Sequence, residues 1–313
     1  MAAGGATRTS SCSVGGATRS IVHPVPLTGR ARLVCVDAMT TGEHRALRVN
    51  TADGVAEVVL VGPGKGNAMG PDFWREVPLA FEELDRDPSV RAVIVRGEGG
   101  NFSYGLDLMA MGGSVGPFVA GTQMAGDRQR LLDLVHDLQR AFDRVAGCRK
   151  PVVAAVSGWC IGGGLDLAAA CDVRLASKDA RFSLREVKVA MVADLGSLQR
   201  LPKIIGQGAT RELAFTGKNI DAERALRIGL VSDVLESEAE LLAAARAMTR
   251  EIADNPAVVV QGIKQVMNAC QDLSVEEGLR HVAVWNAGFL QSLDLAEALT
   301  AFAERRPPKF TGK

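Results

Sequence analysis

Asp194 is a carboxylate within a mostly apolar stretch of sequence, which is unusual unless the carboxylate has a function. It lies near the end of the apolar run "VKVAMVADL", residues 187–195, which only Lys188 and Asp194 interrupt. Burying a carboxylate without a partner is costly, and burial raises its pKa. Glu186 directly precedes the same run, so two carboxyls flank a mostly apolar stretch. Such carboxyls are candidates for proton transfer, because a raised pKa lies closer to neutral pH.

Three consecutive glycines, Gly162 to Gly164, mark a second candidate site. In "SGWCIGGGLDLAAACDV" they follow a predicted buried strand and open a predicted apolar helix. A helix start offers unpaired N–H groups and the positive end of the helix dipole, and glycine lets a ligand approach the backbone. A phosphate could bind there, although the turn has neither the Walker nor the GxGxxG spacing. The alternative is a tight turn with a purely structural role.

A further glycine-containing turn lies in "GNFSYGLDLMAM", residues 100–111. It follows a predicted strand and leads into a predicted helix, for which Asp107 is expected to be the N-cap rather than a catalytic group. Two turns of this kind could aim two backbone N–H groups at one point. That arrangement is an oxyanion hole for a carbonyl or thioester oxygen.

Strands and helices alternate around these turns, which indicates an α/β core. Apolar and polar residues follow strand or helix periods in each segment. The predicted elements are a hairpin of residues 46–50 and 54–61, a helix over 71–87, a strand over 91–97, a helix over 127–148 and a strand over 150–158.

From about residue 209 the pattern changes to helices only, with Asp221 and Ser274 as predicted N-caps. The sequence therefore predicts an α/β core over residues 46–208 and a helical region over residues 209–313. From the residues alone, the helical layer is either a second lobe or a cap that forms oligomers.

Residues 1–45 differ from the rest of the chain. No acidic residue precedes Asp37, and the residues before Asp37 include four arginines among glycine, alanine, serine and threonine. A transit-type peptide has this composition. Because an amphipathic period is lacking, we favour a disordered extension, or a start codon assigned too early, with Met39 as the true start.

Composition excludes several classes of function. The 36 basic and 36 acidic residues balance, and one tyrosine and three tryptophans offer little base-stacking surface, so no nucleic acid partner is expected. The six cysteines form neither a CxxC pair nor a cluster with histidine, which argues against a metal site and against a disulfide framework. No segment resembles a membrane span or a signal peptide.

Several motifs in the same order resemble the enoyl-CoA hydratase/isomerase (crotonase) family. They are "GKGNAM" (64–69), "FSYGLDL" (102–108), "GGGLDLAAACDVRLAS" (162–177) and "LGSLQRLPKIIG" (195–206), and the resemblance covers roughly residues 46–306. It implies the crotonase fold, a spiral of ββα units with a C-terminal helical trimerisation region. It also implies homotrimers or homohexamers that act on acyl-CoA thioesters, with no cofactor besides the coenzyme A of the substrate.

The resemblance also assigns a binding site. The backbone N–H groups of Leu106 and Gly163 are expected to form the oxyanion hole, and the segment around Ala68 is expected to contact coenzyme A. The residues expected to contact substrate or coenzyme A are Lys65, Ala68, Ser103, Tyr104, Gly105 and Asp107.

Three acids decide which branch of the family the chain resembles. Hydratases of the family typically carry two glutamates and a glycine where this chain has Asp166, Glu186 and Asp194. This trio is similar to that of the 3,5-dienoyl-CoA to 2,4-dienoyl-CoA isomerases, which serve β-oxidation of unsaturated fatty acids. The resemblance implies that Glu186 and Asp194 carry the proton from C2 to C6, and that Asp166 orients or tunes Glu186.

Each acid also has a structural alternative. Asp166 could be a first-turn acid that the helix dipole favours, Glu186 could pair with Arg185 or Lys188, and Asp194 could cap a helix that begins at Leu195. Two functional alternatives also stay open. One is a 2-enoyl-CoA hydratase that uses Asp166 and Glu186, and the other is a non-catalytic acyl-CoA-binding subunit. The composition favours a bacterial cytoplasm, with the mitochondrial matrix as the alternative.

Overall fold

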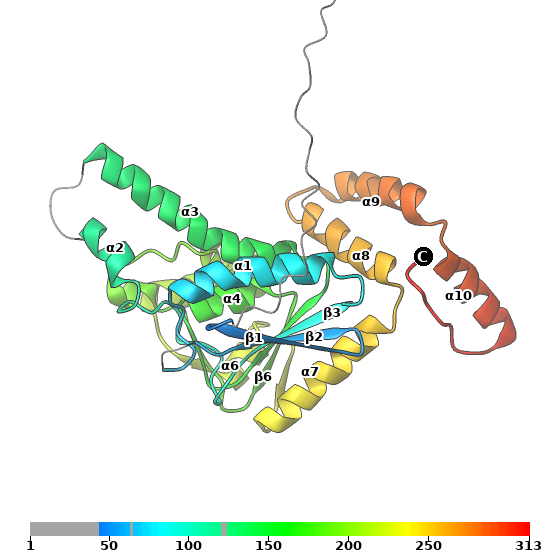
Figure 1. The fold of residues 1–313 in the computed structure, drawn as a ribbon, viewed down its shortest axis with the longest axis horizontal. Helices are drawn as coiled ribbons and strands as arrows, with labels where there is room; N and C mark the ends of the chain where they lie inside the picture. Colours follow the sequence, from blue (N-terminus) through cyan, green and yellow to red (C-terminus); the bar gives the residue numbers. More distant parts are fainter. Residues whose placement is uncertain (1–43, 63–64, 120–123) are drawn as a thin grey trace, which may run out of the picture. The chain divides into compact units, whose positions relative to one another are not determined.

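The computed structural model describes residues 44–62, 65–119 and 124–313 (Figure 1). The predicted N-terminal extension, including Met39, therefore lies outside the described residues except for its last two positions. Within these ranges no helix combines the length and apolar character that crossing a membrane requires.

The core is a six-stranded sheet in the order β1-β2-β3-β4-β6-β9. β1 and β2 form the predicted antiparallel hairpin, in register from Leu47 opposite Leu60 to Ala52 opposite Val55. Asp53 and Gly54 at its turn both have positive φ, as a type I′ turn requires. The remaining pairs are parallel. The strands are β1 (Leu47–Ala52), β2 (Val55–Leu60), β3 (Ala92–Gly97), β4 (Val152–Val156), β6 (Val173–Ser177) and β9 (Asp233–Leu235).

Helices cover both faces of this sheet. Successive strand residues point to opposite faces, and apolar residues on each face pack against helices. Val93 and Val95 of β3 belong to the large core cluster that includes α1 (Pro71–Arg86) and α3 (Ala125–Gly147). Ile94 between them belongs to a second cluster under α7 (Glu238–Ala253). Figure 1 shows α1 and α3 along one side of the strands and α7 along the other.

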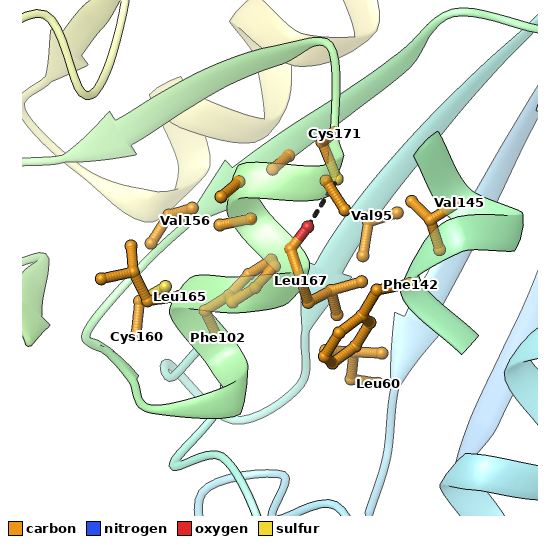
Figure 2. Close-up of a cluster of buried hydrophobic side chains, with 14 of the residues drawn as sticks. Leu60, Val95, Phe102, Phe142, Val145, Val156, Cys160, Leu165, Leu167 and Cys171 are labelled. Atoms are coloured by element: carbon orange, nitrogen blue, oxygen red, sulfur yellow. Dashed lines mark hydrogen bonds between the residues drawn. The ribbon is translucent and has the colours of Figure 1, made fainter. Parts of the chain in front are cut away.

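A second sheet, in the order β5-β7-β8, lies beside a helix that is buried on every side. Its strands are β5 (Trp159–Ile161), β7 (Arg181–Ser183) and β8 (Ile220–Asp221). The buried helix α4 (Gly163–Ala170) follows β5 directly, and Leu165 and Leu167 point into the core beside Phe102 and Phe142 (Figure 2). Any polar side chain on α4 is therefore held away from water.

The expectation of helices only beyond residue 209 is wrong. β8 and β9 both lie in that region, and β9 extends the main sheet by pairing with β6. The predicted boundary at 208/209 falls inside α5 (Ser197–Thr216), just after a bend at Gly206, and α7 still packs on the core sheet. The strands were missed because two or three residues carry no readable period. The remaining helices are α2 (Gly112–Val119), α6 (Ala222–Arg227), α8 (Ala257–Ala269), α9 (Val275–Phe289) and α10 (Leu293–Glu304).

Candidate active site

Two loops meet at the start of α4 and bring two backbone N–H groups together. The loop around Gly105 pairs with Met69 on one side, where the Met69 N–H donates to the Gly105 carbonyl (2.7 Å) and the Asp107 N–H donates to the Met69 carbonyl (3.1 Å). This parallel bridge leaves the N–H of Leu106, the residue between them, directed away from Met69. Gly163 begins α4, so its N–H has no acceptor inside the helix.

Gly105 allows the close approach of the two loops. Its φ is +79°, and a Cβ there would lie 2.6 Å from the carbonyl oxygen of Ile161 and 2.8 Å from the nitrogen of Gly163. A Cβ on Gly163 would in turn lie 3.6 Å from the Leu106 nitrogen. Within the described ranges neither the Leu106 nor the Gly163 N–H donates a hydrogen bond. Two neighbouring free donors at a helix start have the arrangement that an oxyanion hole requires, and this role stays a prediction.

Asp166 is the acid on the buried helix α4, and it is fully buried. Its Oδ1 accepts hydrogen bonds from the N–H and the hydroxyl of Ser197, both at 2.6 Å, while its Oδ2 is buried without a partner among the described residues. Ser197 begins α5, so Asp166 caps the N-terminus of α5 rather than only its own helix. Burial raises the pKa of Asp166 to about 6, although the Ser197 hydrogen bonds favour its charged form.

Glu186 begins a short 3₁₀ helix, Glu186–Val189, after β7. A Cβ on Gly162 would lie 3.4 Å from its Oε1, so the carboxyl faces the glycine turn. Burial raises the pKa of Glu186 to about 7, and the charges of Asp166 and Asp194 add to this. Its Oε2 is buried without a partner, and no ion pair with Arg185 or Lys188 occurs among the described residues. The pairing alternative for Glu186 is therefore wrong.

Asp194 lies in the irregular segment before α5. It does not cap that helix, because the N-cap is Gly196 and no hydrogen bond joins the Asp194 carboxyl to the first turn among the described residues, so the capping alternative is wrong. Partial burial of the carboxyl raises the pKa of Asp194, although the residue as a whole is solvent-exposed. Its charge raises the pKa of both Asp166 and Glu186. The fold therefore brings the three predicted acids into one electrostatically coupled group.

The other predicted site residues have varied surroundings. The Ser103 side chain is fully buried, and its hydroxyl donates to the Asn67 carbonyl (2.8 Å) and accepts from the Gly105 N–H (3.0 Å). It therefore holds the oxyanion-hole loop in shape and has no surface left for substrate. Asp107 accepts from the N–H groups of Met109 (3.1 Å) and Ala110 (2.9 Å), so it caps a turn. The helix predicted to begin at Asp107 is wrong, because α2 begins only at Gly112.

The side chain of Tyr104 contacts the loop of residues 65–69. The Tyr104 ring packs against Gly66 and lies edge-on to Trp159, with 6.5 Å between the ring centroids. Lys65 is exposed and Ala68 is half-buried on this loop. These positions leave Lys65 and Ala68 accessible to a ligand.

Sequence reasoning missed the residues that hold the acids in place. Ser197 binds Asp166, and Gln139 of α3 donates through its amide Nε2 to the main-chain oxygen of Asp194 (2.7 Å). Asn67, at a φ of +54°, donates to the carbonyls of residues 98 and 101 and fixes the loop before Met69. Only Ser197 had a readable signal, as a serine at a helix start after glycine.

The family model described as Enoyl-CoA hydratase/isomerase matches residues 50–313. The chain belongs to the enoyl-CoA hydratase/isomerase family. The crotonase fold expected from the sequence is therefore confirmed.

Three relatives define the similarity more closely. The mitochondrial Delta(3,5)-Delta(2,4)-dienoyl-CoA isomerase of Dictyostelium discoideum is 42% identical over 87% of this chain and 92% of its own length. The human mitochondrial protein of the same name is 40% identical over 90% of this chain and 88% of its own length. The structure of the enoyl-CoA hydratase from Bacillus anthracis has a TM-score of 0.77 and 28% identity, and the match covers 86% of this chain and 100% of that one.

The buried Glu186 carboxyl is expected to lower the free energy of unfolding at alkaline pH. Its pKa is about 7 in the fold against an ordinary 4.5, so the folded state binds the proton more tightly than the unfolded state. Stability then falls as pH rises from about 4.5 to about 7, since the buried carboxyl must ionise. Glu186→Gln removes this cost, and its melting temperature relative to wild type should rise between pH 4.5 and pH 8.

The control for this change is Glu223→Gln on α6, an exposed glutamate far from the acids in sequence. It reports the effect of the amide replacement alone. Thermal unfolding of the three proteins at both pH values makes the comparison. A Glu186→Gln difference that stays constant or shrinks with pH would show that Glu186 is not held protonated by the fold.

Proposed function

We propose that the protein is a Δ3,5-Δ2,4-dienoyl-CoA isomerase. The observation that carries the proposal is the third acid, Asp194, which lies in the same coupled group as Asp166 and Glu186. An oxyanion hole and two carboxyls suffice for several reactions of acyl-CoA thioesters. An isomerisation in which a proton leaves one carbon and another arrives at a distant one needs a carboxyl near each of the two carbons, and Asp194 can supply the second of them. The names of the two relatives at 40–42% identity support the same reaction.

In this reaction the substrate loses a proton at C2 and gains one at C6, and both double bonds shift by one position. The thioester oxygen of a 3,5-dienoyl-CoA accepts hydrogen bonds from the Leu106 and Gly163 N–H groups. One carboxylate then removes a proton from C2, and the resulting dienolate carries its negative charge on that oxygen. A neutral carboxyl delivers a proton to C6, which gives the 2,4-dienoyl-CoA and leaves the two carboxyls with exchanged protonation states.

Glu186 and Asp194 are the proposed proton-transfer pair. They must start in opposite protonation states, and like charges in partly buried surroundings favour this, because ionising one raises the pKa of the other. Asp166 is the proposed tuning residue. The N-terminus of α5 and Ser197 favour its charged form, and this charge raises the pKa of Glu186 toward neutrality.

Replacing Asp166 should therefore move the pH dependence of the reaction. Asp166→Asn keeps an oxygen that accepts from Ser197 but removes the negative charge near Glu186. The pKa of Glu186 then falls, although burial still keeps it above its ordinary value. The limb of the kcat/KM profile nearest pH 7 should shift to lower pH, which a series of initial rates from pH 5 to 9 measures. A limb that stays in place, or moves to higher pH, would contradict the tuning role.

Hydration of a 2-enoyl-CoA is the second candidate, and the similarity to the Bacillus anthracis hydratase favours it. Asp166 and Glu186 could hold and activate a water, but hydration has no evident use for Asp194. A non-catalytic acyl-CoA-binding subunit is the third candidate. It would have no need of two free N–H donors and three coupled acids.

Ultraviolet spectroscopy of the purified protein with 3,5-octadienoyl-CoA tests the proposal. The conjugated 2,4-dienoyl absorbance should grow. In a parallel reaction, 2-octenoyl-CoA should lose its 2-enoyl absorbance slowly or not at all. Rapid hydration of 2-octenoyl-CoA without isomerisation would favour the hydratase, and acyl-CoA binding without turnover of either substrate would favour the binding subunit.

We further propose that the chain works as a homotrimer or homohexamer. Helices α8 to α10 carry large apolar side chains that stay exposed in the single chain, including Ile263, Met267, Leu279, Val284, Leu299 and Phe302. Exposed apolar surface of this extent is typical of an interface. For location, a bacterial cytoplasm stays the proposal, and the mitochondrial names of the two relatives support the matrix as its alternative.

A further inference from the structure

The position of Asp194 depends on contacts outside its own segment. Residues 191–194 have no helix or strand, and they connect the 3₁₀ helix of Glu186 to α5. Glu186 is held by its short helix, whereas Asp194 has no regular structure to fix it. A group that transfers a proton must be held in a productive geometry, so something else must position this acid.

Helix α3 contacts this segment directly through Gln139 and indirectly through Arg200 of α5. The Gln139 amide donates to the main-chain oxygen of Asp194 at 2.7 Å. The Arg200 guanidinium donates to the main-chain oxygen of Leu195 (3.2 Å) and to the carboxylate of Asp143 (2.8 Å). Gln139 and Asp143 are four residues apart, so they lie on the same face of α3. One face of α3 thus holds the Asp194 carbonyl directly, and it holds the Leu195 carbonyl only through Arg200.

Arg200 fits closely over the loop between these ties. A Cβ on Gly196 would lie 1.9 Å from the Arg200 Nη1, so the guanidinium occupies the space that a side chain at position 196 would need. Arg200 also favours the charged form of Asp166. Changing Arg200 would therefore alter geometry and charge together, whereas Gln139 is neutral.

We propose that Gln139 is a positioning residue for the isomerisation, acting through Asp194. This inference rests on the proposed function, because it assigns Gln139 to the acid that distinguishes the isomerase from a hydratase. The contact goes to the main chain of Asp194 and leaves its carboxyl free. Gln139 therefore determines where the acid lies, while the neutral amide adds no charge to the group of three acids.

A double-mutant cycle tests the proposal. Gln139→Met keeps the length of the side chain and removes the donor, and it is combined with Asp194→Asn. A displacement of about 1 Å at a reacting group can cost about 100-fold in rate, so Gln139→Met alone should lower kcat by about tenfold or more, with KM little changed. In the Asp194→Asn background it should have no further effect. Single-turnover rates with enzyme in excess make the slow variants measurable.

Gln129→Met is the matched control on the same helix. Gln129 donates to Asp133 on the exposed part of α3, away from the loop. The control should keep the wild-type kcat. Equal losses from Gln139→Met with and without the Asp194 carboxyl, or no loss in either background, would overturn the proposal, because the effect would then not pass through Asp194.

Hydrogen–deuterium exchange separates this inference from the proposed function. Loss of the tie should speed exchange of the backbone amides of residues 191–196 in Gln139→Met and not in Gln129→Met. If wild type does not isomerise the dienoyl substrate, the proposed function fails. Faster exchange would then still support the tie between Gln139 and the Asp194 segment, and unchanged exchange would overturn the tie.

Discussion

Asp194→Asn is expected to lower the rate of 3,5-dienoyl-CoA isomerisation by about 100- to 10,000-fold, which is the usual contribution of a positioned acid or base. The amide is nearly the same size as the carboxyl but can neither take nor deliver the proton. The hydrogen bond from Gln139 goes to the main-chain oxygen, so the substitution leaves the loop in place. The growth of the 2,4-dienoyl absorbance measures the rate.

Asp137→Asn provides the control for this substitution. Asp137 lies on the exposed surface of α3 and pairs with Arg140, so its change should leave the rate close to that of wild type. A second control is any hydration of 2-octenoyl-CoA by the wild type, which should survive in Asp194→Asn. If Asp194→Asn isomerises as fast as Asp137→Asn, the third carboxyl has no part in the chemistry.

Gly105→Ala is expected to lower the same rate by about 100- to 1,000-fold, the usual cost of losing one donor from an oxyanion hole. The new methyl group would lie 2.6 Å from the Ile161 carbonyl and 2.8 Å from the Gly163 nitrogen. One of the two loops must move, which separates the Leu106 and Gly163 N–H groups. The loss should appear in kcat more than in KM, because the hole binds the dienolate more strongly than the thioester.

Gly99→Ala is a matched control, since Gly99 also has a positive φ (+71°) but no atom near its Cβ position. Both variants strain the backbone, and only Gly105→Ala also closes the site. Circular dichroism and thermal unfolding confirm that each variant folds. Equal activity of the two variants would contradict the assignment of the hole.

The sequence predicted much of the core because its signals are local. The hairpin of β1 and β2, the helices α1 and α3 and the caps at Asp221 and Ser274 all follow from periodicity and turn chemistry. The glycine runs likewise located the two turns that meet at the start of α4. The three acids were predicted through family resemblance, and in the fold the charge of Asp194 raises the pKa of Asp166 and of Glu186.

Contacts between segments that are distant along the chain could not be predicted from the sequence. Ser197 lies 31 residues from Asp166, and Gln139 lies 55 residues from Asp194, so no local pattern pairs them. β9 has only three residues, and its place in the main sheet depends on β6. The burial of Ser103 was also missed, because a serine between apolar and aromatic residues is compatible with either a surface turn or a core position.

The most direct test of the account is to run the wild-type reaction in D₂O and to locate deuterium in the product by NMR. Two carboxyls with opposite protonation states predict a 2,4-dienoyl-CoA with deuterium at C6, because the neutral acid has exchanged with solvent before it delivers its proton. A product that retains at C6 the proton taken from C2 would mean that a single group carries it. A 3-hydroxyacyl product would mean that the enzyme adds water, and either result would contradict the proposed roles of Glu186 and Asp194.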